Sequence, residues 1–136
     1  MGEGSTVMNW DEFAKWSAAL CAWREARGEG RDGQRAVIHV IANRAKQQNK
    51  SWPEIVYAKL QFSSMTYPQD PQLTLVPKRP DPVFVDCYEI ADAIFQGLDF
   101  DLTDGATHYF ADSIAMPEWA KSMKQTIKIG HQTFFK

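Results

Sequence analysis

The chain has 136 residues, of which 44% are hydrophobic and 24% charged, and its formal net charge is −2 at pH 7. This length is that of a single domain with its own hydrophobic core. The slightly acidic net charge argues against a nucleic-acid partner, because binding to phosphates needs a basic stripe. The sequence has no run of about 18 apolar residues, so we expect no membrane span.

The first 28 residues predict a leader followed by a helix. Residues 1–8 have neither the basic nor the apolar region of a signal peptide, and we expect them to be a flexible leader. Asn9 is a suitable N-cap for a helix that ends near Gly28. Trp10 falls on the broad apolar face of this helix, so we expect it to face the core.

A second helix is predicted from a cap at Asp32 to about Gln48. Its wide apolar face predicts that it is the central, buried helix of the domain. His39 lies on the opposite side, where we expect it to be solvated. Farther along, the capping box Ser51-Trp52-Pro53-Glu54 predicts a short helix that ends near Lys59.

The second half of the chain predicts a long loop, an amphipathic helix and a small sheet. Residues 60–80 are polar and interrupted by prolines, and a loop of this length in a compact domain is often functional. Residues 82–95 form the clearest amphipathic helix. The remaining predicted elements are a short helix at 117–123 and three strands at 107–111, 126–129 and 131–135. Together they predict an α+β fold, mostly α-helical with a small antiparallel sheet, in one domain over residues 9–136.

Two cysteines, Cys21 and Cys87, fall on core-facing helix stripes. Buried free thiols are the default interpretation of such positions. Because sequence gives no distance between the two, a disulfide bridge between them stays open.

Two glutamates four residues apart, Glu25 and Glu29, are the most informative candidates for chemistry. Both lie near the end of the first predicted helix. Burial of a carboxyl group beside apolar surface disfavours its charged form, and a carboxyl in such a place can protonate the leaving oxygen of a glycosidic bond. Spacing alone is equally typical of two solvated residues at a helix end.

The same region begins a series of motifs that resembles the bacterial and phage cell-wall hydrolase family typified by spore cortex-lytic enzymes. The motifs follow the family's order from about Asn9 onward. They are Trp23 to Gly30, Gly33, Ala36-Val37, Val40, Asn43-Arg44, Trp52-Pro53, Gln61-Phe62-Ser63, Asp104 to Phe110, Trp119 and Ile129-Gly130-His131 with Phe134. The resemblance implies a lysozyme-like fold and action on peptidoglycan glycan strands.

The resemblance also implies which residues form the site. Glu25 is expected to be the catalytic acid and base, and Glu29 a supporting residue or second carboxylate. Gln61, Phe62 and Ser63 are expected to bind substrate. Tyr109 and Trp119 are further candidates for substrate contacts, although a tyrosine or tryptophan at either position is equally typical of a core.

Two reaction types remain open for such a site. A lytic transglycosylase cleaves the β-1,4 bond between N-acetylmuramic acid and N-acetylglucosamine with one carboxyl group and closes a 1,6-anhydro ring; the resemblance favours this route. A muramidase hydrolyses the same bond and needs a second carboxylate, for which Glu29 is the nearest candidate. The other classes to weigh are a catalytically idle peptidoglycan-binding module and, more distantly, a peptidase or amidase.

We expect no cofactor and no metal. A zinc site of His108 and His131 with Asp104 or Asp112 would lack the usual ligand spacing. Residues 99–105 resemble a calcium loop, but Phe110 stands where the bidentate glutamate belongs.

The expected partner is peptidoglycan, with no nucleic acid and no membrane span, and the expected state is a monomer. Without a signal peptide, a wall-degrading enzyme must reach its substrate by another route. Release through a holin-type membrane lesion, as for a phage lysin, is one such route.

Overall fold

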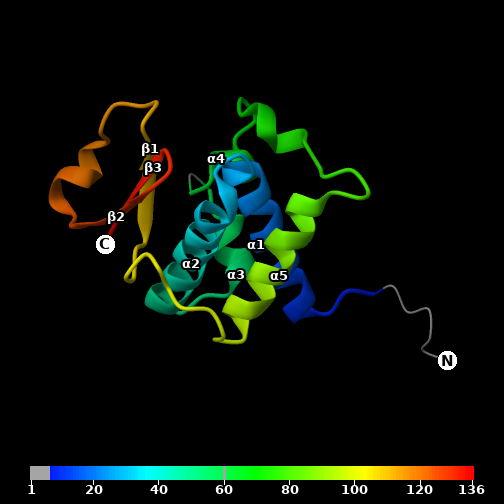
Figure 1. Ribbon diagram of the computed structural model, residues 1–136. Coiled ribbons are helices and arrows are strands. Elements are labelled where there is room, and N and C mark those ends of the chain that lie inside the picture. The colour runs from blue at the N-terminus through cyan, green and yellow to red at the C-terminus, as the bar shows by residue number, and fades with distance from the viewer. Residues whose placement is uncertain (1–6, 60) are drawn as a thin grey trace.

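The computed structural model describes residues 7–59 and 61–136 (Figure 1). Of the predicted leader, only Val7 and Met8 lie within the described residues, and both are exposed. Helices form one layer, and a small sheet lies beside α2 at its edge. The elements in chain order are α1 (Trp10–Ala26), α2 (Gly30–Gln48), α3 (Trp52–Val56), α4 (Ser63–Thr66), η1 (Pro71–Thr74), α5 (Pro82–Phe95), β1 (His108–Ala111), η2 (Glu118–Ser122), β2 (Gln125–Ile129) and β3 (Gln132–Phe135).

The first two helices meet at a sharp corner. Helix α1 starts where Asn9 accepts a hydrogen bond from the backbone N–H of Glu12 at 2.8 Å, as its N-cap role predicts. Helix α2 starts earlier than predicted, directly after Glu29, and Asp32 lies within its first turn. Gly30 makes this possible because its φ of +81° lets the chain reverse within one residue.

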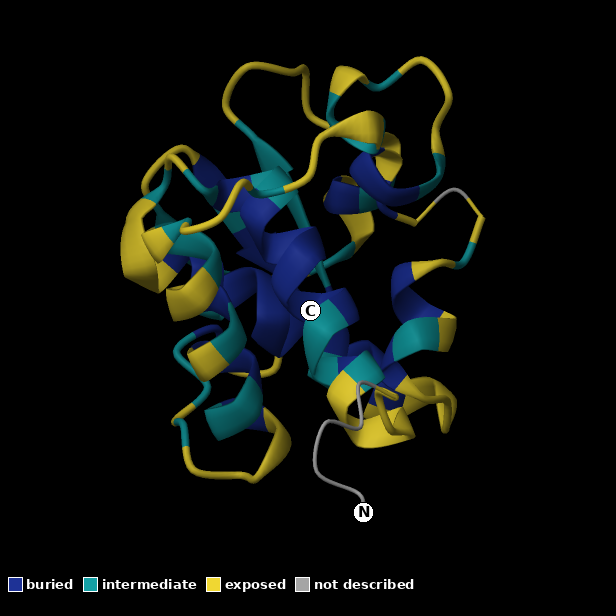
Figure 2. Cartoon of the chain, turned by 90° about the vertical axis from the view of Figure 1, so that its right-hand side faces the viewer, coloured by how far each residue is buried: buried dark blue, intermediate teal, exposed yellow. Residues whose placement is uncertain are grey.

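Helix α2 is the central helix, as predicted. One of its faces joins α1, α3 and α5 in the main core, which includes Val37, Ile38 and Ile41. Another face, with Ala36 and Val40, packs against Phe134 of the sheet. Buried segments therefore run through the middle of the molecule, and exposed ones lie in its outer loops (Figure 2).

The sheet is antiparallel, with the strand order β1-β3-β2. Strand β1 pairs with β3 so that Tyr109 lies opposite Phe134. Gly130, with φ +58°, makes the tight turn between β2 and β3. A mostly helical domain with a small antiparallel sheet confirms the predicted α+β class.

The connections between these elements are more ordered than predicted. The capping box of α3 is present in both directions, but the helix ends at Val56 and not near Lys59. Residues 61–80, predicted as loop, contain α4 and the 3₁₀ helix η1. Helix α5 has the predicted bounds, and the predicted helix at 117–123 is the 3₁₀ helix η2.

Two expectations about helix faces are wrong. His39 is buried, because the loop after α5 covers this side of α2: its Nε2 lies 2.7 Å from Oδ2 of Asp99. Trp10 is 83% exposed, because the first turn of α1 extends beyond the helices packed against it. Periodicity gives the apolar side of a helix, but it does not give the length over which a neighbour covers that side.

Both cysteines are buried, and both are free thiols. In residues 7–59 and 61–136, no helix combines the length and apolar character that crossing a bilayer requires.

Candidate active site

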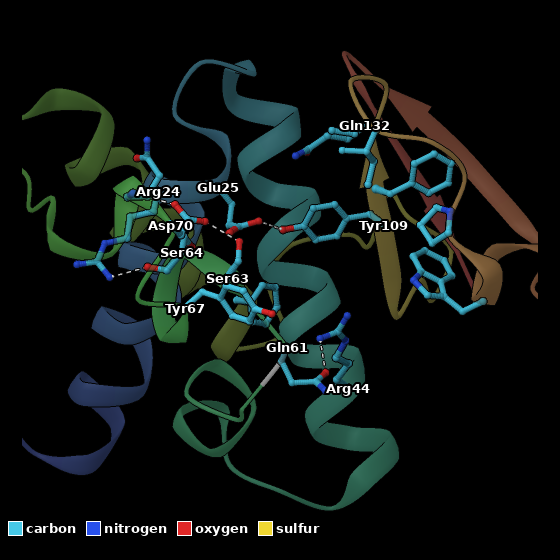
Figure 3. A pocket seen from close by; sticks show the side chains of 17 residues that line it. Arg24, Glu25, Arg44, Gln61, Ser63, Ser64, Tyr67, Asp70, Tyr109 and Gln132 are labelled. Carbon is cyan, nitrogen blue, oxygen red and sulfur yellow. Dashed lines mark hydrogen bonds between the residues drawn. The ribbon is translucent and has the colours of Figure 1, made fainter.

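An open cavity of about 560 Å³ lies where the end of α1 meets the segment around α4 and the first strand of the sheet (Figure 3). Glu25 lies on one wall, and residues from the helices, from the segment around α4 and from the sheet surround it. The lining comprises Arg24, Glu25, Arg44, Gln61, Phe62, Ser63, Ser64, Tyr67, Asp70, Gln72, Tyr109, Phe110, Ala111, Ile114, Pro117, Trp119 and Gln132.

Glu25 is half-buried in the last turns of α1, and a tyrosine from the sheet contacts it. The hydroxyl group of Tyr109 donates a hydrogen bond of 2.6 Å to Oε1 of Glu25. Burial and the nearby Glu25 carboxyl group raise the pKa of Tyr109 well above its ordinary value. The hydroxyl therefore stays protonated and occupies Oε1, so that Oε2 is the oxygen left for a reacting group.

The predicted Gln61-Phe62-Ser63 motif lies on the opposite wall. Gln61 and Ser63 are exposed, whereas Phe62 is only 2% exposed and lies beneath the guanidinium group of Arg44, 5.0 Å from the ring centre. Phe62 thus anchors the segment from within the core. Its burial leaves little of the ring to pack on a sugar, in contrast to the role expected from sequence.

A carboxylate that sequence reasoning missed, Asp70, also lines the cavity. It accepts hydrogen bonds from the hydroxyl group of Ser63 at 2.6 Å and from the backbone N–H of Gln72 at 2.8 Å. Asp70 is the N-cap of η1, and the Asp-Pro pair at residues 70 and 71 was a local signal for it. The resemblance placed the start of this loop, Gln61 to Ser63, in the site, but nothing in the sequence indicated that Asp70 folds back to Ser63.

Arg24 holds this loop against α1 and explains its position. Its Nη1 donates to the carbonyl oxygen of Ser64 at 3.1 Å, and its Nε donates to that of Leu75 at 3.0 Å. Both ends of the segment that carries Asp70 are therefore tied to the residue next to Glu25.

Arg44 of α2 connects the two walls from below. It is 6% exposed and donates to the carbonyl oxygen of Thr107 at 2.5 Å and to Oε1 of Gln61 at 2.8 Å. One buried guanidinium group thus binds the start of the sheet and the loop at the same time.

Several polar atoms around the cavity have no partner in the protein. Within the described residues, three buried side-chain atoms lack a hydrogen bond: Oγ of Ser64, Oε1 of Gln72 and Oε1 of Gln132. All three residues line this cavity. Because an unpaired buried polar group costs about 1–3 kcal/mol, their concentration here points to a polar ligand or ordered water.

Glu29 lies apart from the cavity lining and joins the helices to the sheet. Its Oε1 accepts a hydrogen bond of 2.9 Å from the backbone N–H of His131, at the turn between β2 and β3. Two glycines leave space for this side chain: a Cβ at Gly33 would lie 2.6 Å from Cβ of Glu29, and one at Gly130 would lie 2.7 Å from its Oε1. This hydrogen bond joins the helices to the sheet, and we call it the Glu29 clasp.

Trp119 lies on the sheet side of the cavity, half-buried in an aromatic cluster. Its ring centre is 5.0 Å from that of His108 and 5.5 Å from that of Phe135. In residues 7–59 and 61–136, no three His, Cys, Asp or Glu side chains form a metal-binding group.

A family model described as Cell Wall Hydrolase matches residues 28–135, a range that begins just after Glu25. The structure is similar to the catalytic domain of the Bacillus cereus SleB protein, with a TM-score of 0.73 and 26% identity over 99% of this chain and 100% of that chain. It also has the fold of the catalytic domain of the germination-specific lytic transglycosylase SleB from Bacillus anthracis, with a TM-score of 0.72 and 24% identity over 97% and 99% of the two chains. No curated protein sequence matches this chain.

Proposed function

The chain belongs to the cell wall hydrolase family and is an enzyme of that class, and we propose that it is a peptidoglycan glycosidase. The bond cleaved is the β-1,4 bond between N-acetylmuramic acid and N-acetylglucosamine, and the reaction is that of a lytic transglycosylase. Residues 9–136 form its single catalytic domain. No cofactor takes part.

Glu25 is the acid that protonates the leaving oxygen. The single observation that carries this assignment is the half-buried Glu25 carboxyl group, which faces a polar cavity and accepts a hydrogen bond from the Tyr109 hydroxyl group on one of its oxygens. Because Tyr109 occupies Oε1, the transferable proton of the acid form lies on Oε2. General acid catalysis of this kind contributes about 10²–10⁴-fold to a rate.

The second half of the reaction closes a ring. As the bond to the leaving oxygen breaks, the 6-hydroxyl group of the muramic acid attacks its own anomeric carbon and loses a proton. In the simplest form of this route, the Glu25 carboxylate takes that proton, and Glu29 has only the supporting role of the clasp.

The substrate contacts come from both walls. Gln61 and Ser63 on the loop contact sugar hydroxyl or acetamido groups, and Trp119 beside the sheet contacts a sugar face. Tyr109 adds its hydrogen bond to Glu25. Phe62 supports the loop from within the core.

The test is digestion of purified peptidoglycan followed by mass spectrometry of the soluble products. We expect products with 1,6-anhydromuramic acid from the wild-type protein and none from Glu25→Gln, whose fold is checked by circular dichroism. Reducing-end muramic acid would instead indicate hydrolysis. Intact glycan from a folded wild-type protein would leave a binding module or a peptide-bond hydrolase.

We extend the proposal to lysis of whole bacteria, as by a phage endolysin acting as a monomer. Clearing of a bacterial suspension by the wild-type protein, and its absence with Glu25→Gln, tests this role.

A further inference from the structure

We propose that Asp70, acting through Ser63, receives the proton of the hydroxyl group that attacks the anomeric carbon. This inference rests on the proposed function and deepens it. It replaces the simplest form of the route, in which the Glu25 carboxylate takes this proton, by one with a second carboxylate, and that carboxylate is Asp70, not Glu29.

The first observation is the position of the Ser63–Asp70 pair. Both side chains line the same cavity as Glu25. In the view of Figure 3, the pair lies on one side of the Glu25 carboxyl group and Tyr109 on the other. A sugar bound next to Glu25 therefore contacts the Glu25 carboxyl group on one side and the hydrogen-bonded Ser63–Asp70 pair on another.

The second observation is how the donors and acceptors are used. Ser63 donates its only proton to Oδ2 of Asp70 at 2.6 Å, a length typical of a hydrogen bond to a charged oxygen. The oxygen of Ser63 is thereby left as an acceptor. It can receive a hydrogen bond from a substrate hydroxyl group, and the carboxylate behind it gives the transferred proton a place to go.

The third observation is that Asp70 is held in place before substrate binds. Its other oxygen accepts the backbone N–H of Gln72 at 2.8 Å, which fixes the plane of the carboxylate. Arg24 ties the flanking segment to α1 through the carbonyl oxygens of Ser64 and Leu75. Groups that are preorganised in this way lose little freedom when the reaction occurs.

The proton transfers balance. Glu25 gives its proton to the glycosidic oxygen as the bond from this oxygen to the anomeric carbon breaks. The 6-hydroxyl oxygen forms the new bond to that carbon, its proton passes to Ser63, and the proton of Ser63 passes to Asp70. Asp70 ends protonated and Glu25 ionised, and exchange with water restores both.

The test is the pH dependence of kcat for release of anhydro products from purified peptidoglycan. We expect Asp70→Asn to lower kcat about 10²-fold and to remove the acidic limb of the profile, since no group at this position must then be ionised. Ser63→Ala should have a similar effect, and the double variant should be no worse than either single one. The other ionisable groups lining the cavity, which stay unchanged in these variants, are Arg24, Glu25, Arg44, Tyr67 and Tyr109.

A matched control is Asp81→Asn. Asp81 also caps a helix that has proline at its first position, and it accepts the backbone N–H of Phe84 at 3.0 Å, but it is not part of the cavity lining. Asp81→Asn should lower thermal stability and leave the pH profile of kcat unchanged.

Three results would overturn the inference: Asp70→Asn with kcat within about threefold of wild type, an unchanged acidic limb, or losses that multiply in the double variant. Anhydro products from wild type together with any of these leave the proposed function intact. Absence of glycan cleavage by wild type would overturn both.

Discussion

Replacement of Glu29 by glutamine distinguishes a structural role of this residue, as a clasp between helices and sheet, from a catalytic role. Glutamine keeps an acceptor oxygen for the backbone N–H of His131, which is 2.9 Å from Oε1 in the wild type, but it has no charge. A hydrogen bond to a charged group contributes about 1.5–3 kcal/mol and a neutral one about 0.5–1.5 kcal/mol, so the expected loss is about 1 kcal/mol. This bond is solvent-exposed, which puts the cost at the low end of that range.

Two measurements follow for Glu29→Gln. The thermal unfolding midpoint, followed by circular dichroism, should fall by roughly 2–4 °C, because about 1 kcal/mol has that effect in a domain of this size. The rate of soluble product release from peptidoglycan should stay within about threefold of wild type, since the amide still holds the turn of the sheet. Loss of a general base would instead cost about 10²–10⁴-fold.

The matched control is the same chemical change four residues earlier. Glu25→Gln should abolish product release. Because the hydrogen bond from Tyr109 to Oε1 of Glu25 also loses its charged acceptor, the unfolding midpoint should fall to a similar extent. If Glu29→Gln lowers kcat about 10²-fold or more without a change in the midpoint, the clasp interpretation is refuted and hydrolysis with two carboxylates becomes the better mechanism.

Three further changes test the packing. Gly130→Ala should lower the free energy of unfolding by at least about 1–2 kcal/mol in urea titrations, since it puts a side chain at positive φ and 2.7 Å from Oε1 of Glu29; adding Glu29→Ala should relieve only the steric part. Asp99→Asn should reduce stability at neutral pH and make stability fall less steeply in acid. Burial raises the pKa of Asp99, but hydrogen bonds from neighbouring basic side chains outweigh this effect and hold the pKa below its ordinary value. The ionised Asp99 therefore stabilises the fold above about pH 4, and this contribution is lost as pH falls through the lowered pKa. A thiol reagent at pH 8 should modify neither Cys21 nor Cys87 until denaturant is added, because burial raises the pKa of Cys87 to about 12 and that of Cys21 well above its ordinary value; rapid labelling of the native protein would contradict the burial.

The parts of the fold that sequence predicted well are those with local signals. Helix α5 has an Asp-Pro start and a continuous apolar stripe, and its predicted and observed bounds agree. The strands were found within one or two residues because alternation and Gly130 mark them. Tyr109 on the first of these strands was a candidate for the site, and the structure brings its hydroxyl group to Glu25.

The parts that sequence did not predict depend on contacts between distant residues. The segment around Asp70 takes its position from Arg24, which reaches residues 40 and 51 positions later in the chain. His39 is buried because a loop sixty residues later brings Asp99 to it. A local sequence pattern gives no information on contacts between residues 40 to 60 positions apart. For this reason Asp70 was missed and His39 was expected to be solvated.

The buried guanidinium group of Arg44 fixes how the two walls of the cavity lie relative to each other. Arg44 donates hydrogen bonds to Oε1 of Gln61 on one wall and to the carbonyl oxygen of Thr107 on the other, and it therefore holds the two walls together at the floor of the cavity. Loss of this one side chain would therefore release the loop and the sheet from each other at the same point.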